Sequence, residues 1–187
     1  MAFNVAEFRA NMIGDGARPN LFSVNLTFPT IAVDGTAAGQ QVQFMAKSSQ
    51  LPGSSINTVS QYYFGRELKF AGNRTFPQWS IQVINDENFI IRNSMESWMN
   101  AINSHAGNLR TAAALNPSNY SADALVTQYS KTNSIIKQYK FVGLFPIDVG
   151  VIELDWGSND TIEEYGITFD YQWWEAVPVG GTSGSTT

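Results

Sequence analysis

Apolar and polar residues alternate along most of the chain, a pattern typical of half-buried β-strands. Between residues 21 and 28, for example, Phe22, Val24 and Leu26 alternate with Ser23 and Asn25. Because successive side chains of a strand point to opposite faces, this spacing predicts one buried and one solvated side. The same alternation predicts strands at 66–70, 78–84, 123–130, 134–144, 151–156 and 162–175. The chain is therefore expected to be mostly β.

The longest predicted strand, 162–175, has one aromatic face and one polar face. The face expected to be buried consists of Tyr165, Ile167, Phe169, Tyr171 and Trp173. The opposite face carries Glu164 and Asp170, and the alternation leaves Trp174 pointing outward. In the same way, 78–84 is expected to place Trp79, Ile81 and Val83 inward.

One segment changes to helical spacing. Its apolar residues are Ile91, Met95, Trp98, Met99 and Ile102, and they follow Asn85-Asp86-Glu87, which offers N-cap chemistry and an acid in the first turn. This predicts an amphipathic helix over about 87–106 that packs its apolar stripe against the sheet.

The remaining segments divide the chain into three parts. Val5, Phe8 and Met12 predict a short helix within an extended N-terminal assembly arm, 1–16. A single β domain is expected over 17–177, with loops at 29–41, 51–58 and 104–122. The Gly/Ser/Thr-rich segment 178–187 is expected to be a flexible tail.

Charge is scarce and unevenly distributed. Charged residues make up 14% of the 187, against a usual value of about 25%. From residue 141 onward there are eight acidic and no basic residues, whereas the first 140 carry eleven basic and eight acidic ones. Opposite charge on the two parts of one chain favours head-to-tail contact between copies, although acids also simply solubilise an exposed strand face.

No pattern of catalytic or metal-binding residues is found. The chain has no cysteine, one histidine (His105) and no phosphate-binding glycine loop. Glu153 and Asp155 share a face of the predicted strand 151–156, but such pairs are common on solvated strands. No enzyme activity, cofactor or metal is therefore predicted. No segment approaches the run of about 20 apolar residues that a membrane span needs, so no membrane contact is expected.

Several ordered sequence blocks carry a resemblance to a known family. The blocks are Ala17-Arg18-Pro19-Asn20-Leu21-Phe22, Gly72-Asn73-Arg74-Thr75-Phe76, Asn85-Asp86-Glu87, Gly143-Leu144-Phe145-Pro146, Leu154-Asp155-Trp156 and Trp174-Glu175. Their order and spacing resemble those of the tail tube proteins of T4-like contractile-tailed bacteriophages. Related tube subunits of type VI secretion and bacteriocin-like injection devices are the alternative within this resemblance.

The resemblance implies a β-sandwich or barrel-like tail tube fold. It further implies hexameric rings that stack into a virion tail tube, assembled in the host cytoplasm. The implied partners are further copies of the chain, the tail sheath, tape measure, baseplate and tail-terminator proteins, and genomic DNA passing through the lumen during ejection.

Two hypotheses follow for individual residues. Acidic side chains that repel phosphates are expected to line the lumen, and the candidates are Glu153, Asp155, Glu164 and Asp170. The arm and the 51–74 hairpin are expected to bridge rings or subunits through Val5, Phe8, Met12, Tyr62, Tyr63, Phe64, Arg66 and Arg74. The competing class is a carbohydrate-binding β-sandwich that uses Trp174 as an exposed platform.

Overall fold

The computed structural model describes residues 4–179; the predicted tail therefore lies almost wholly outside the described residues. The strands are β1 (Phe22–Leu26), β2 (Ala46–Ser49), β3 (Ser55–Tyr63), β4 (Arg66–Thr75), β5 (Trp79–Ile84), β6 (Ala122–Tyr129), β7 (Ile135–Val149), β8 (Glu164–Asp170) and β9 (Trp173–Val177). The α-helices are α1 (Val5–Asn11), α2 (Gly35–Met45), α3 (Ile90–Ile102) and α4 (Pro117–Tyr120), with 3₁₀ turns at Ile13–Asp15 and Ala112–Ala114. The prediction of a mostly β chain is confirmed.

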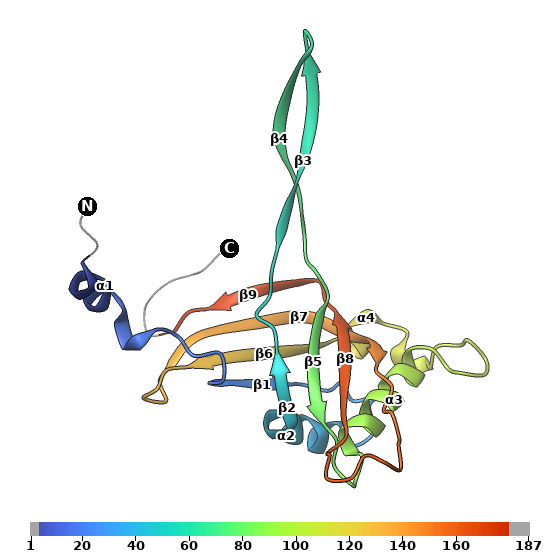
Figure 1. The fold of residues 1–187 in the computed structure, drawn as a ribbon. Helices are drawn as coiled ribbons and strands as arrows, with labels where there is room; N and C mark the ends of the chain where they lie inside the picture. Colours follow the sequence, from blue (N-terminus) through green and yellow to red (C-terminus); the bar gives the residue numbers. More distant parts are fainter. Residues whose placement is uncertain (1–3, 180–187) are drawn as a thin grey trace.

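Two crossing groups of antiparallel strands share β7. The first half of β7 pairs with β6 and β9, and its second half pairs with β8, so that the strand order is β1-β6-β7-β8-β5-β2. In Figure 1, β1, β6, β7 and β9 run across the molecule, whereas β2, β5 and β8 run along the direction of the long β3–β4 hairpin.

A glycine marks the point where β7 changes partners. Gly143 has φ of 66°, a left-handed backbone conformation that residues other than glycine adopt only at a cost in free energy. Just before it, Val142 lies opposite Trp173 of β9; just after it, Phe145 lies opposite Asp170 of β8. Gly143 therefore provides the bend that lets one strand serve both groups.

The core fills the angle between the two groups of strands. Trp79 stacks on Phe141 and Phe169, with ring centroids 4.5 and 5.4 Å apart. Ile81 and Val83 are buried beside it, so the predicted inward face of β5 is confirmed. Helix α3 adds Ile91, Met95 and Trp98 to the core, as the helical spacing predicted. The Trp98 indole N–H donates to the Tyr120 carbonyl at 2.7 Å.

Helix α3 is shorter than the predicted 87–106. Its N-cap residue is Phe89, which has a left-handed backbone and makes no side-chain capping hydrogen bond. The predicted N-cap residues act elsewhere. Asn85 donates its side-chain amide to Glu163 at 2.8 Å, and Asp86 accepts from the Gln41 side chain.

Other sequence predictions are wrong. The predicted loop 29–41 includes residues 35–41 of helix α2. The predicted strand 151–156 is a loop without strand partners. The predicted strand 162–175 is divided into β8 and β9 by a break at Tyr171 and Gln172, which reverses the burial of the two tryptophans. Trp173 is 45% exposed, and Trp174 is half-buried against the core.

Candidate assembly surfaces

The β3–β4 hairpin projects far from the rest of the molecule (Figure 1). Its two strands are joined by Phe64 and Gly65, both with positive φ, as in the two-residue turns that match the twist of a hairpin. Every residue of β3 is exposed, and so is all of β4 except Gly72. A two-stranded ribbon is at best marginally stable in water, so this hairpin needs a partner.

The register gives the hairpin two different faces. Tyr63 lies opposite Arg66 and Val59 opposite Phe70, and directly opposed residues share a face. Leu68 and its partner Gln61 follow the same alternation and share this face with Arg66. Its four apolar side chains are here called the apolar hairpin face: Val59, Tyr63, Leu68 and Phe70. These four side chains are 42–65% exposed. The opposite face is more polar and carries Ser60, Tyr62, Glu67 and Lys69.

Two tryptophans hold the segment that leads into the hairpin. The indole N–H of Trp79 donates to the Gln50 carbonyl at 3.0 Å, and the indole N–H of Trp174 donates to the Gly53 carbonyl at 2.9 Å. Trp174 also packs edge-on against Tyr139, with ring centroids 5.4 Å apart. These contacts fix the base of the hairpin relative to the core. They also occupy the residue that the carbohydrate-binding interpretation needed as a free platform.

The hairpin carries three cations, Arg66, Lys69 and Arg74. Among residues 4–179, none of them takes part in an ion pair. The one acid of the hairpin, Glu67, accepts a hydrogen bond of 2.6 Å from the Ser60 hydroxyl. The hairpin thus presents net positive charge beside its apolar face.

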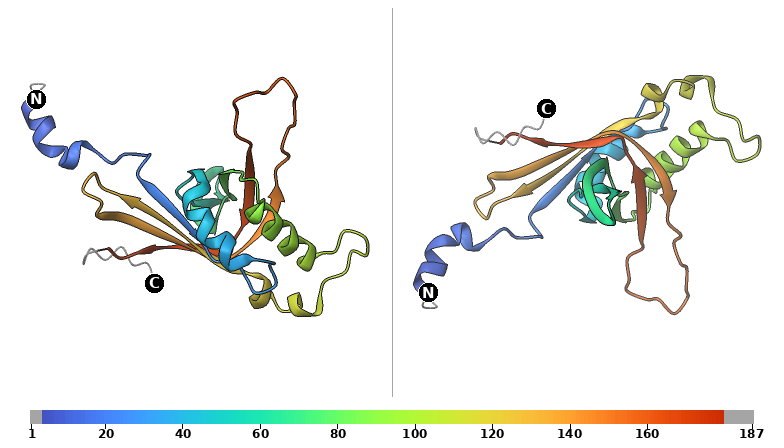
Figure 2. Two further views of the ribbon diagram at one scale, coloured as in Figure 1. Left: turned by 90° about the horizontal axis from the view of Figure 1, so that it is seen from below. Right: turned by 90° about the horizontal axis from the view of Figure 1, so that it is seen from above.

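The N-terminal arm is a second exposed apolar element. Helix α1 has no buried residue, and Val5, Phe8 and Met12 are all exposed. Its N-cap, Asn4, accepts from the backbone N–H of Ala6 at 3.1 Å. Figure 2 shows α1 lying well away from the sheets.

The arm is anchored at its inner end. Lys131 donates to the Asp15 carboxylate at 2.8 Å, and this contact lowers the pKa of Asp15 below its ordinary value of 3.8. Both groups are largely exposed, so the pair orients the arm more than it stabilises the fold.

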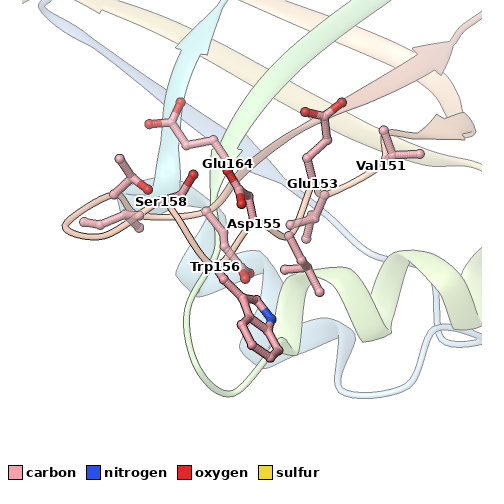
Figure 3. A pocket seen from close by; sticks show the side chains of 11 residues that line it. Val151, Glu153, Asp155, Trp156, Ser158 and Glu164 are labelled. Atoms are coloured by element: carbon pink, nitrogen blue, oxygen red, sulfur yellow. The ribbon is translucent and has the colours of Figure 1, made fainter.

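The loop between β7 and β8 combines acids with exposed apolar side chains. This acidic loop, 150–163, carries four acids and no basic residue: Glu153, Asp155, Asp160 and Glu163. Val151, Leu154 and Ile162 are each more than two-thirds exposed, and Trp156 is fully exposed. The loop and the start of β8 surround an open pocket of about 540 Å³ (Figure 3).

The structure does not bring the four predicted lumen acids onto one strand face. Glu153, Asp155 and Glu164 line the pocket of the acidic loop. Glu164 is also ion-paired with Lys47, at 2.6 Å. Asp170 lies at the other end of β8, half-buried, where it accepts from the backbone N–H of Tyr171 at 3.0 Å.

Sequence reasoning missed Trp156 and the apolar side chains around it, because alternation placed them in a strand. It expected a hairpin over 51–74 but assigned 51–58, which includes the first half of β3, to a loop. The available signal was the hairpin itself: residues of high β propensity lie on both sides of Phe64-Gly65, at the spacing of a two-residue turn.

Within residues 4–179, no cluster of three histidine, cysteine or acidic side chains is placed to hold a metal ion. None of the helices in this part of the chain is long and apolar enough to cross a membrane.

Comparison with known proteins identifies the family. A family model described as phage tail tube protein matches residues 17–177. The tail tube protein gp19 of Enterobacteria phage T4 is 33% identical over 168 residues, which cover 89% of this chain and 96% of that protein. The tail tube protein of Serratia phage KSP90 is 29% identical over 175 residues, which cover 92% and 96% of the two chains.

Solved structures share the fold. A chain from the sheath–tube complex of an extracellular contractile injection system, in its extended state, has a TM-score of 0.58 at 13% identity; the match covers 95% of this chain and 100% of that one. A chain from the baseplate of the anti-feeding prophage has a TM-score of 0.60 at 12% identity, covering 88% and 97%. Together with the family match and the T4 relative, these findings show that the chain belongs to the phage tail tube protein family and is a structural tube subunit, not an enzyme.

Proposed function

We propose that this protein forms hexameric rings that stack into the tail tube of a contractile-tailed phage, and that the lumen of the tube conducts genomic DNA during ejection. The observation that carries the assembly proposal is the hairpin. Its apolar face is not covered by any other part of residues 4–179, and a two-stranded ribbon by itself is only marginally stable. Contact with further copies would bury that face.

The proposed partners follow from the family and from the assemblies in which similar folds occur. Those assemblies include a tube with its sheath, a sheath and tube terminator, and a baseplate. We propose that this chain likewise contacts a sheath, a terminator and a baseplate, and that a tape measure protein and DNA occupy its lumen in turn. A virion tail assembled in the host cytoplasm is the corresponding location. A tube of an injection device is the alternative, and the 33% identity with the T4 protein favours the phage tail.

We further propose that the polar face of β8 lines the lumen. Glu164 and Asp170 both lie on this face, since their positions differ by an even number of residues and their strand neighbours Tyr165 and Phe169 are buried. Carboxylates repel phosphates over a Debye length of about 8 Å, so DNA would slide without binding. A structure of the assembled tube that placed both carboxylates on the outer wall would refute this assignment.

Electron microscopy of the purified protein tests the assembly proposal. Negative-stain images should show rings with six-fold symmetry and stacked tubes, whereas monodisperse monomers at all concentrations would overturn it. The double variant Leu68→Ser, Phe70→Ser removes half of the apolar hairpin face and should form few tubes while keeping its circular dichroism spectrum. The control, Leu109→Ser, Leu115→Ser, removes two leucines outside the hairpin that are even more exposed than Leu68 and Phe70, and should leave tube formation unchanged.

The arm is tested separately. We expect deletion of 1–16 to give a folded protein that polymerises poorly, because the arm exposes Val5, Phe8 and Met12 and its helix α1 contributes no buried residue. Abundant long tubes from this truncated protein would show that the arm is not a bridge between rings.

A further inference from the structure

We propose that the acidic loop is the docking site for the hairpin of a second copy of this chain. This inference rests on the proposed stacking of rings and identifies the surface that receives the hairpin. The docking would join the hairpin to the apolar and acidic side chains of the loop, through the apolar hairpin face with Arg66 beside it and through Lys69 on the opposite face.

The two segments lie at opposite ends of the molecule. In Figure 1 the hairpin rises above the sheets, and the acidic loop lies below them, at the end remote from the hairpin tip. Figure 2 shows that the loop also reaches out to the side, clear of the helices. One copy cannot join its own two segments, but a copy stacked on the next can bring them together. Such a contact joins different surfaces of identical subunits, so it can repeat along an open stack.

The charges of the two segments are complementary. The hairpin carries Arg66, Lys69 and Arg74 against one acid, and the acidic loop carries four acids against no base. Among the described residues, none of these hairpin cations and none of the four loop acids takes part in an ion pair. Complementary charge of this kind steers encounter and fixes register. It singles out the hairpin of another copy as the occupant, because α1, the other exposed apolar element, carries one acid and one base.

The apolar surfaces supply the remaining attraction. The hairpin exposes Val59, Tyr63, Leu68 and Phe70, and the loop exposes Val151, Leu154, Trp156 and Ile162. Groups of large exposed apolar side chains on a soluble chain mark contact sites. A tryptophan at the centre of an interface, ringed by charge, is also the arrangement in which a few residues dominate binding.

Charge reversal tests the pairing. The hairpin variant Arg66→Glu, Lys69→Glu and the loop variant Glu153→Lys, Asp155→Lys should each raise the critical concentration for tube formation roughly tenfold or more, because like charges then oppose each other. The chain carrying all four changes restores complementary signs and the original net charge of −5, and should form tubes near the wild-type concentration. An equimolar mixture of the two double variants should also form tubes.

A matched control separates pairing from net charge. Adding Glu87→Lys and Asp148→Lys to the hairpin variant also returns the net charge to −5, but changes exposed acids outside the loop. This chain should remain defective. Each variant is checked for folding by circular dichroism, and all substituted side chains are exposed, so the monomer should keep its stability.

The outcomes distinguish the inference from the proposed function. If the wild-type protein forms no tubes, the stacking proposal itself fails. If the wild type forms tubes and either double variant assembles equally well, the docking pair is wrong. If both double variants fail and the combined chain fails as well, the hairpin and the loop each contact something other than the other, such as a sheath-like partner or the rest of the ring, and the pairing is again overturned.

Discussion

Replacing Trp79 by phenylalanine probes the junction between the core and the base of the hairpin. The indole of Trp79 is buried, stacks between Phe141 and Phe169, and donates to the Gln50 carbonyl at 3.0 Å. Phenylalanine keeps one aromatic ring but removes the N–H donor and part of the ring system.

Two losses contribute to the expected effect. The Gln50 carbonyl loses its partner in a partly buried place, which costs about 1–2 kcal/mol. The smaller ring leaves unfilled space between Phe141 and Phe169, which costs about 1–2 kcal/mol more. We therefore expect Trp79→Phe to lower the free energy of unfolding by about 2–4 kcal/mol.

Urea denaturation followed by circular dichroism measures this change, at protein concentrations below those that form tubes, since assembly would add to the apparent stability. Trp156→Phe is the matched control, because it makes the same chemical change at a fully exposed position and should alter the free energy of unfolding by less than about 0.5 kcal/mol. If the two variants proved equally stable, the Trp79 indole would not hold the core and the hairpin base together as described.

Three further predictions concern the bend in β7, a buried phenol and the second indole contact. Gly143→Ala should lower the free energy of unfolding, measured in urea titrations, by about 1–3 kcal/mol. The reason is that φ of Gly143 is 66° and the added Cβ would lie 2.9 Å from Cγ of Gln172. An unchanged urea midpoint would show that β7 bends without this glycine. Burial raises the pKa of Tyr165 from 10.0 to about 12. Between about pH 10 and 12 the folded state therefore retains a proton that the unfolded state loses, and the free energy of unfolding should fall as pH rises across that interval. Tyr165→Phe should remove about 2 kcal/mol of this alkaline loss, and equal losses in both proteins at pH 11 would contradict the assignment. Trp174→Phe removes the indole donor to the Gly53 carbonyl and should lower the free energy of unfolding in urea by only about 0.5–1.5 kcal/mol. It should nevertheless increase amide hydrogen exchange at the base of the hairpin. Unaltered exchange there would show that the indole does not restrain the hairpin base.

Strands buried on one face were predictable because alternation depends only on local geometry. Trp79, Ile81 and Val83 lie inward as expected, and Ile91 and Met95 mark the buried stripe of α3. In these elements each side chain has a single environment, either core or solvent, and the sequence records that environment directly.

Helix α2 was missed because its glycines serve packing instead of a turn. A Cβ on Gly39 would lie 2.8 Å from the backbone oxygen of Leu26, so the helix sits against β1 at a distance that only glycine permits. Its buried residues are Gly35, Ala38 and Val42, which are too small to give a marked apolar stripe. A helix that packs closely against a strand therefore has the same glycine-rich and alanine-rich sequence here as a loop would have.

The loop 150–163 and the break between β8 and β9 were missed for a different reason. Alternation shows that a segment can be a strand, but it does not show whether a neighbouring strand is available to pair with it. Residues 151–156 have no such neighbour, and Trp173 follows a change of pairing partner that shifts its face. Trp156 thus becomes a surface residue although its local pattern indicates a strand.

The placement of the hairpin and the acidic loop at opposite ends has a consequence for the finished tube. A filament built from such subunits has direction: every interior copy has both surfaces covered, one terminal ring presents bare hairpins, and the other presents bare acidic loops. The proteins that start and stop growth therefore face chemically different problems. The protein at the hairpin end must offer an acidic and apolar surface, and the protein at the other end must offer a basic and aromatic surface. A single capping protein could therefore not serve both ends.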